Sequence, residues 1–450
     1  MKTSLNDEAL AHCRATFAAD PVARIARNAV AKTAIKAVAL NRDAVARLTH
    51  TYSHHVKTGK STAQNASGRC WMFAGLNLFR TQIAEKLGVE EFELSQNYLM
   101  FWDKLEKANY FLENILATLD EPVGSRLLDW LLASPLQDGG QWDMFAALVK
   151  KYGVVPKEAM PETESSSRSA DMNALMTLKL RQAAAELRAA HATGASASAL
   201  QAQKDALLPA LYRMLATHLG EPPTEFLWQW RDKDKNFHRD GILTPEQFCK
   251  KYVTVELDEL VCLIHCPQTT KSYNTPYTIA YLGNVIGGQP IQYLNVEMAT
   301  LKAATQAMIQ AGKPVWFGCD VGKQMDRDLG LMDLELFEYE PLYGTSLELG
   351  KAARLDYGQS LMTHAMVLTG VDIDEAGAPR KWRVENSWGD KGGDQGFMAM
   401  TDAWFDEYLY EVAVEKKYLP KELLALLEGP LVALDPWDPM GSLALASELL

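Results

Sequence analysis

The order of helical and strand-like segments is the feature that most constrains how this chain can fold. Before about residue 220, apolar residues recur at helical spacing, as over residues 94–119 and 141–152. Beyond about residue 224, short runs of apolar and β-branched residues predominate, as over residues 260–264, 314–321 and 363–372. One helical pattern, over residues 298–311, interrupts them. Parallel sheets are built from alternating strands and helices, so this separation predicts an α+β fold.

Composition limits the classes of function. Of the 450 residues, 48% are hydrophobic and 23% are charged, which is typical of a globular protein that buries a large core. A net charge of −12 disfavours nucleic acids and anionic membranes as partners. Residues 1–8 lack the apolar core of a signal peptide, and the six cysteines are sparse. We therefore expect a cytoplasmic protein with reduced thiols and no membrane span.

Changes in composition divide the chain into five predicted parts. The polar stretch 162–169 precedes two long helical patterns, 172–190 and 196–219, which predict an inserted helical hairpin. Residues 21–48, near the N-terminus, are rich in alanine and helical in character. The predicted parts are an N-terminal arm (1–60), a helical subdomain (61–160), the inserted hairpin (161–225), a mainly β subdomain (226–420) and a C-terminal tail (421–450).

A candidate nucleophile lies at Cys70. An amphipathic run over residues 71–87 follows it directly, so the thiol lies at a helix N-terminus, where the helix dipole and the backbone N–H groups favour the thiolate. Gln64, six residues upstream, carries a side-chain amide that can donate to an oxyanion. A buried cysteine is more often inert, so this interpretation depends on finding a base.

The candidate base is His364, which lies in an apolar run, and Asn386 follows the next strand-like run. An asparagine side-chain oxygen can accept a hydrogen bond from the imidazole and fix its tautomer, and Trp388 is placed to shield that bond from water. A lone histidine in such a run is more often a core residue. The occurrence of Gln64, Cys70, His364 and Asn386 in this order instead indicates a cysteine hydrolase.

A second group of metal-ligand types, Cys262, His265 and Cys266, lies in or beside the apolar run 260–264. Its spacing completes a four-ligand metal site only if Cys249 joins from a distance. We interpret the run as a buried strand whose thiols belong to the core.

Several stretches resemble a known family. Gln64, Cys70-Trp71, His364 and the Asn-Ser-Trp-Gly element at 386–389 match the motifs of the papain superfamily in order. Longer stretches are similar to the bleomycin hydrolase and bacterial aminopeptidase C branch, namely residues 67–71, 313–321, 355–366 and 436–441. The separation of the Cys and His also exceeds the ~130–150 residues typical of papain-like enzymes, which points to the same branch.

This resemblance implies a papain-like fold with an inserted helical domain, assembled as a homohexamer and acting on peptides without a metal or organic cofactor. By position it implies Cys70 as the nucleophile and His364 as the general base and acid. It likewise implies Asn386 as the residue that orients the imidazole and Gln64 as the oxyanion donor.

The resemblance also implies that the stretch 137–142 pairs through its backbone with the substrate next to the scissile bond. Glycines suit this role, because a missing Cβ lets an extended peptide approach. The predicted substrate-binding residues are Gly139, Gly140, Trp71 and Trp388. The alternative for this stretch is a plain turn into the following helix.

In this branch the chain's own C-terminus lies in the cleft and its carboxylate meets the substrate's α-ammonium. The implied activity is a cysteine aminopeptidase that removes N-terminal residues from peptides and acts on amide drugs of the bleomycin type. This chain continues through residues 445–450, beyond the matching tail. Four outcomes are open for these six residues: the enzyme trims them, they plug the cleft, they exit into the internal channel that the resemblance implies for the hexamer, or they form a disordered end.

Three other functions stay open at this point. With its tail outside the cleft, the same fold acts as an endopeptidase. A DNA-binding regulator has precedent in the branch, but the acidic composition disfavours it. A catalytically idle hexameric scaffold is disfavoured by the intact Cys70, His364, Asn386 and Gln64.

Overall fold

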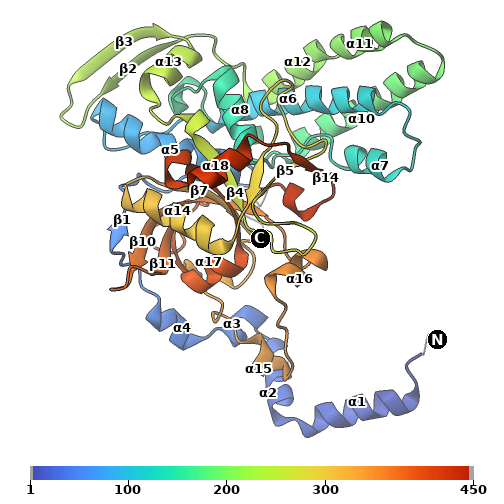
Figure 1. Cartoon of the computed structure of the whole chain (residues 1–450), viewed down its shortest axis with the longest axis vertical. Coiled ribbons are helices and arrows are strands. Elements are labelled where there is room, and N and C mark those ends of the chain that lie inside the picture. The colour runs from blue at the N-terminus through green and yellow to red at the C-terminus, as the bar shows by residue number, and fades with distance from the viewer. Residues whose placement is uncertain (1–3, 445–450) are drawn as a thin grey trace.

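The N-terminal arm is a series of short helices that projects from the rest of the molecule (Figure 1). The computed structural model describes residues 4–444. The arm contains α1 (Asp7–Ala19), α2 (Pro21–Val30), α3 (Ile35–Ala39) and α4 (Arg42–Arg47). The helical character over residues 21–48 is thus divided among three helices. The Asn41 side chain starts the last of them by accepting from the backbone N–H groups of Asp43 and Ala44.

The helical half of the molecule packs around α6. Its helices are α5 (Cys70–Leu87), α6 (Gln96–Ala117), α7 (Arg126–Ala133), α8 (Trp142–Tyr152), α9 (Glu164–Ser167), α10 (Ala170–Ala192), α11 (Ala197–Asp205) and α12 (Leu208–Leu219). α6 contacts α8, α10 and α12, and it buries Leu99, Ala108 and Leu112. The pattern predicted over 196–219 breaks between α11 and α12, because Pro209 in the first turn of α12 has no N–H to continue a helix.

The second half is built on one long sheet. Its strands are β4 (Leu260–Ile264), β5 (Thr275–Ile279), β6 (Tyr293–Asn295), β7 (Val315–Cys319), β8 (Met325–Asp326), β9 (Leu331–Met332), β10 (His364–Ile373), β11 (Pro379–Glu385), β12 (Phe397–Thr401), β13 (Leu409–Glu415) and β14 (Val432–Leu434). They lie in the order β14-β5-β6-β4-β13-β7-β10-β11-β12-β9-β8, and β1 (His54–His55) pairs with β10. A separate hairpin joins β2 (Phe226–Arg231) to β3 (Phe237–Leu243).

Helices are more frequent in the second half than the sequence indicates. Besides α14 (Met298–Gln310), which the pattern over 298–311 predicts, there are α13 (Pro245–Tyr252), α15 (Tyr339–Tyr343), α16 (Lys351–Asp356), α17 (Asp402–Tyr408) and α18 (Lys421–Leu427). The expectation of a single helix here is wrong. These additional helices have eight residues or fewer, which is too short for a helical period to emerge.

The two halves meet where α5 packs against β10 and β7. After α18 the chain returns to this boundary, and β14 adds to the sheet parallel to β5. Figure 1 shows the described end of the chain between the helical half and the sheet. The junction therefore brings together segments from the beginning, middle and end of the sequence.

Candidate active site

Two loops are joined at this junction. The backbone N–H of Gln64 donates to the Ser387 carbonyl at 2.8 Å, and the N–H of Gly389 donates to the Thr62 carbonyl at 2.9 Å. One loop leads into α5 and the other leaves β11. The pairing therefore fixes the segment before Cys70 against the segment that carries Asn386.

Cys70 is the first residue of α5 and is fully buried. The preceding Arg69 does not cap the helix. Its guanidinium binds Glu162 through Nη1 at 3.1 Å and Nη2 at 2.7 Å, and its Nε donates to Ser67 Oγ at 2.9 Å. These contacts hold the loop that precedes α5. The thiol therefore lies at the N-terminus of the helix, where the helix dipole and the first-turn N–H groups favour an anion.

His364 and Asn386 are brought together by the register of β10 and β11. Val367 is paired with Glu385, so the start of β10 lies beside the residue that follows β11. His364 Nε2 and Asn386 Oδ1 are 2.8 Å apart. The Trp388 ring lies over the imidazole with a centroid separation of 4.8 Å. Because all three side chains are buried, the His–Asn hydrogen bond is protected from competition by water.

The Gln64 side chain is oriented by two serines that the sequence analysis did not single out. Gln64 Nε2 donates to the Ser67 carbonyl at 2.6 Å, and Gln64 Oε1 accepts from Ser387 Oγ at 2.6 Å. Ser67 Oγ donates back to the Gln64 carbonyl at 2.6 Å. These contacts fix the orientation of the amide, with Nε2 on the side of Ser67 and Oε1 on the side of Ser387. Ser387 belongs to the Asn-Ser-Trp-Gly element, which was the available signal for it.

Asp138 connects the loop before Cys70 with the stretch 137–142, which contains Gly139 and Gly140. Its carboxylate accepts from the backbone N–H of Gly68 at 2.9 Å, from Lys104 Nζ at 2.5 Å and from Asn173 Nδ2 at 2.8 Å. The Ser169 hydroxyl donates to it as well. Although burial opposes ionisation, the Lys104 ammonium and these donors hold the pKa of Asp138 well below its usual range. A permanently charged acceptor thus fixes the two loops relative to each other.

Lys107 supports the same stretch from α6. Its Nζ donates to the carbonyls of Gln137 at 3.0 Å and Gly139 at 2.6 Å, and to Asp103 Oδ2 at 2.7 Å. The ammonium also lies 5.2 Å from the centre of the Trp71 ring. Two buried lysines therefore hold the loop that contains both glycines.

Gly140 packs directly against the ring of Trp71. A Cβ built on it would lie 2.4 Å from the Trp71 ring, so no other residue fits without movement. Trp71 has no exposed surface, and its Nε1–H donates to the Asp138 carbonyl at 2.7 Å. Trp71 therefore packs against the Gly139–Gly140 backbone, whereas Trp388 packs against the imidazole of His364.

The C-terminal tail lies against this backbone. The N–H of Gly140 donates to the Ala444 carbonyl at 3.2 Å, and the N–H of Ala444 donates to the Gly140 carbonyl at 3.3 Å. Ser442 Oγ donates to the Met362 carbonyl at 2.6 Å, and Gln141 Nε2 donates to the Ser442 carbonyl. The tail thus adds one antiparallel bridge beside the site. The predicted extension, residues 445–450, lies outside the described residues.

Cys262 and Cys266 lie in and beside β4, as the strand interpretation expects. The Cys266 N–H donates to Asn295 Oδ1 at 2.9 Å. Within residues 4–444, no three His, Cys, Asp or Glu side chains gather in a way that could hold a metal ion. No helix in that same part of the chain has the length and apolarity to cross a membrane.

Comparison with known proteins gives consistent matches over the full length. The sequence model of the peptidase C1-like family matches residues 4–441. An aminopeptidase C from Listeria innocua is 47% identical over 445 residues, covering 99% of this chain and 100% of the relative. Human bleomycin hydrolase is 42% identical over 451 residues, covering 98% and 99%. The crystal structure of PepW from Lactobacillus rhamnosis HN001 superposes with a TM-score of 0.96 at 48% identity, covering 99% of this chain and 100% of that one.

Proposed function

The chain belongs to the peptidase C1-like family and is a cysteine-type aminopeptidase, and from that premise we propose how its residues carry the reaction. The resemblance to the bleomycin hydrolase and aminopeptidase C branch is confirmed, as is the papain-like α+β fold. The assignment of individual residues remains our proposal. It rests on the geometry at the junction of α5 with β10.

In the proposed acylation step, the Cys70 thiolate attacks the carbonyl carbon of the first peptide bond while His364 is protonated. Asn386 holds Nε2 of His364 at 2.8 Å, so the imidazole uses Nδ1 for exchange with the thiol. The tetrahedral intermediate collapses when His364 transfers its proton to the leaving amine, which breaks the C–N bond and leaves a thioester.

Deacylation reverses these roles. His364 takes a proton from water as the water oxygen attacks the thioester carbonyl, and the Cys70 sulfur leaves as thiolate, which regenerates the ion pair. In both steps the oxyanion accepts from the Cys70 backbone N–H and from Gln64. The contacts of the Gln64 amide with Ser67 and Ser387 hold it in a fixed orientation beside Cys70, which supports its role as an oxyanion donor.

The pairing of Ala444 with Gly140 is the observation that supports our proposal for how the enzyme selects the N-terminus of its substrate. Gly139 and Gly140 form the edge on which an extended substrate would add next to the scissile bond, and here the tail adds to that edge. Because the tail occupies this edge, the substrate has no room to continue past it in the N-terminal direction. The first residue of the substrate, with its free amine, therefore lies between the tail and Cys70. The rival endopeptidase function requires the tail to leave this edge.

We propose that residues 445–450 are removed or displaced in the mature enzyme, so that a terminal carboxylate meets the substrate's α-ammonium. Intact mass after purification tests the removal, with Cys70→Ala as the control. A shorter wild-type chain beside a full-length C70A chain supports trimming by the enzyme itself. Identical full-length masses for both would exclude it.

We also propose peptides as the natural substrates, with amide drugs of the bleomycin type as further substrates, and a cytoplasmic location. The proposed assembly is a homohexamer. Exposed apolar side chains on the arm support association, because Phe17 on α1 and Val22 and Ile25 on α2 are unburied in a single chain. Sedimentation equilibrium tests this assembly, and a monomer at micromolar concentration would contradict it.

A DNA-binding regulator is a less favoured function, since the net charge is −12. A gel shift at physiological salt separates it from the peptidase. Thiol labelling of Cys70 likewise separates an active enzyme from an idle scaffold.

A further inference from the structure

Two cationic side chains flank the site, each beside one of its tryptophans. Lys107 Nζ lies 5.2 Å from the centre of the Trp71 ring, and Arg327 Cζ lies 5.1 Å from the centre of the Trp388 ring. Trp71 packs against the glycine edge, whereas Trp388 packs against the imidazole of His364. The two cations therefore lie beside different parts of a bound substrate.

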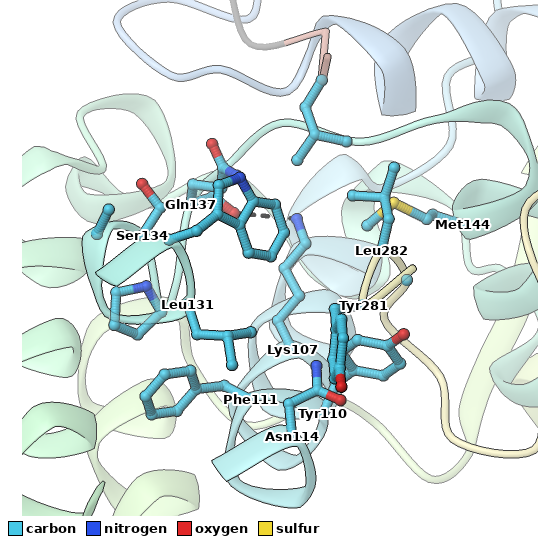
Figure 2. A pocket seen from close by; sticks show the side chains of 15 residues that line it. Lys107, Tyr110, Phe111, Asn114, Leu131, Ser134, Gln137, Met144, Tyr281 and Leu282 are labelled. Carbon is cyan, nitrogen blue, oxygen red and sulfur yellow. Dashed lines mark hydrogen bonds between the residues drawn. The ribbon is translucent and has the colours of Figure 1, made fainter. Parts of the chain in front are cut away.

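Lys107 is committed to the fold. Its ammonium donates to Asp103 Oδ2 at 2.7 Å and to the carbonyls of Gln137 and Gly139 at 3.0 and 2.6 Å. Figure 2 shows this side chain along a cavity of about 190 Å³, with its end directed at Gln137. An ammonium has three N–H groups, and these three acceptors occupy them. Lys107 thus has no donor left for a substrate.

Arg327 is partly exposed and lies on the turn that joins β8 to β9. The Leu329 N–H donates to Asp326 Oδ1 at 3.0 Å, and the Gly330 N–H donates to the Arg327 carbonyl at 3.3 Å. Gly392, in the loop after Trp388, packs on the same carbonyl, since a Cβ built on it would lie 2.5 Å from that oxygen. The backbone that carries the guanidinium is therefore held from both sides.

The Arg327 guanidinium is directed at Trp388. Its Nη2 donates to the Trp388 carbonyl at 3.4 Å, and its Cζ lies near the indole ring. The centre of this indole ring is 4.8 Å from the centre of the His364 imidazole. The indole Nε1–H is buried and has no hydrogen-bond acceptor among residues 4–444. One tryptophan thus places a cation and an unused N–H donor next to His364.

This region meets the leaving group of the substrate. In the proposed reaction His364 gives its proton to the leaving amine, so the residue that carries this amine lies beside the imidazole and Trp388. The leaving group of an aminopeptidase is the rest of the peptide, which ends in a carboxylate. The chain has a net charge of −12 and repels such an anion at long range, so binding it needs a local cation. A guanidinium suits a carboxylate because it donates two parallel N–H bonds to the two oxygens.

Building on the proposed function, we propose that Arg327 and the Trp388 N–H form a carboxylate-binding subsite on the leaving-group side, with Arg327 as its specificity residue. The subsite favours peptides that carry a carboxylate on the residue after the scissile bond. This carboxylate is either the terminal α-carboxylate of a dipeptide or the side chain of an aspartate or glutamate. No bond is made or broken at the subsite, since the carboxylate enters with the substrate and leaves with the released amine.

Two pairs of peptides separate these sources of the carboxylate. Leu-Ala and Leu-Ala-amide differ only at the C-terminus, whereas Leu-Asp-amide and Leu-Asn-amide differ only in one side chain. Release of free leucine by the full-length enzyme gives kcat/KM for each peptide. In the wild type, the anionic member of at least one pair should have a kcat/KM roughly tenfold higher, since a charge-assisted pair forms at a partly exposed guanidinium. The pair that shows the preference identifies the source.

Four variants of one arginine or another test where the preference comes from. Arg327→Gln should bring the ratio of kcat/KM within the pair close to one, and Arg327→Glu should invert it, because a carboxylate there repels the anionic substrate. Arg327→Lys keeps the charge without the planar fork, so it should retain part of the preference. Arg380→Gln removes the same charge at an exposed position at the far end of β11 and should keep the wild-type ratio.

The ratio separates recognition from folding, because a loosened fold lowers both rates of a pair together. A wild-type ratio close to one in both pairs, or a ratio that R327Q leaves unchanged, would overturn the subsite while Cys70-dependent hydrolysis leaves the aminopeptidase intact. If Cys70→Ala does not abolish hydrolysis of any of the four peptides, the proposed function itself is overturned.

Discussion

Glu411 is a buried acid whose ionisation should make the stability of this enzyme depend on pH. It lies inside β13 with no exposed surface, next to Cys262 and facing Asp143 of α8. Burial raises the pKa of Glu411 from its ordinary 4.5 to about 8, and the Asp143 charge acts in the same direction. Burial also raises the pKa of Asp143 to about 7. Two acids at the boundary of the two halves thus favour their protonated forms.

The raised pKa of Glu411 makes the free energy of unfolding fall as the pH rises. A carboxyl whose pKa is raised by folding stabilises the folded state fully below pH 4.5, and that stability is lost as the pH rises toward 8. At about 1.4 kcal/mol per pKa unit, the ceiling for Glu411 is roughly 5 kcal/mol. We expect about 2 kcal/mol to be observed, because water and side chains relax around the ionised group.

Glu411→Gln should therefore unfold at higher urea than its parent above pH 7, with a flatter dependence on pH between 5 and 8.5. Urea midpoints in a Cys70→Ala background avoid self-cleavage. Glu415→Gln is the matched control on the same strand, since Lys313 and Lys417 lower the pKa of Glu415 against the effect of burial. E415Q should leave the slope unchanged. If the urea midpoints of E411Q and its parent change in parallel with pH, the reasoning is refuted.

Three further predictions concern the site. Gln64→Ala should lower kcat about 10²-fold with little change in KM, measured on free aminoacyl amides, and a kcat within twofold of wild type would argue against Gln64 as oxyanion donor. Gly140→Ala should lower kcat/KM at least tenfold, because the added Cβ overlaps Trp71, whereas Gly322→Ala, with open space around it, should have no effect. Asp138→Asn leaves the buried Lys104 without its counter-charge and should lower the free energy of unfolding in urea by about 3 kcal/mol. The control Asp258→Asn, at an exposed ion pair, should lower it by less than about 1 kcal/mol, and equal losses would contradict the role of the buried pair.

The sequence predicted the residues whose chemistry has a motif. Cys70, His364, Asn386 and Gln64 stand out as candidates because each type is uncommon in its setting and their order is informative, and their roles stay predictions. The structure brings His364 to Asn386 at 2.8 Å through strand register.

The supporting residues were not predictable in the same way. Asp138 joins Gly68, Lys104 and Asn173, which lie far from it in sequence, and an aspartate in a loop carries no local sign of such partners. Tyr281, in the loop after β5, likewise has a strained φ of 59°, which depends on contacts made by the whole loop rather than on its own residue type.

The ends of several helices could not be predicted from composition, because local side-chain contacts decide where a helix starts. The alanine-rich residues 21–48 are helical in composition throughout, but the Asn41 side chain accepts from the backbone N–H groups of Asp43 and Ala44 and so starts a separate helix, α4. Helices such as α15 and α16 are too short for periodicity to detect. In contrast, α6 and α10 were long enough for apolar spacing to predict them.

The central claim is that Cys70 acts on a substrate whose free amine must lie beside a docked tail. The most direct measurement compares hydrolysis of a free aminoacyl fluorogenic amide with that of its N-acetylated counterpart, for the wild type and for Cys70→Ala. The account predicts turnover of the free amide alone, abolished in C70A. Equal turnover of the blocked amide by the wild type, or activity that survives in C70A, would contradict it.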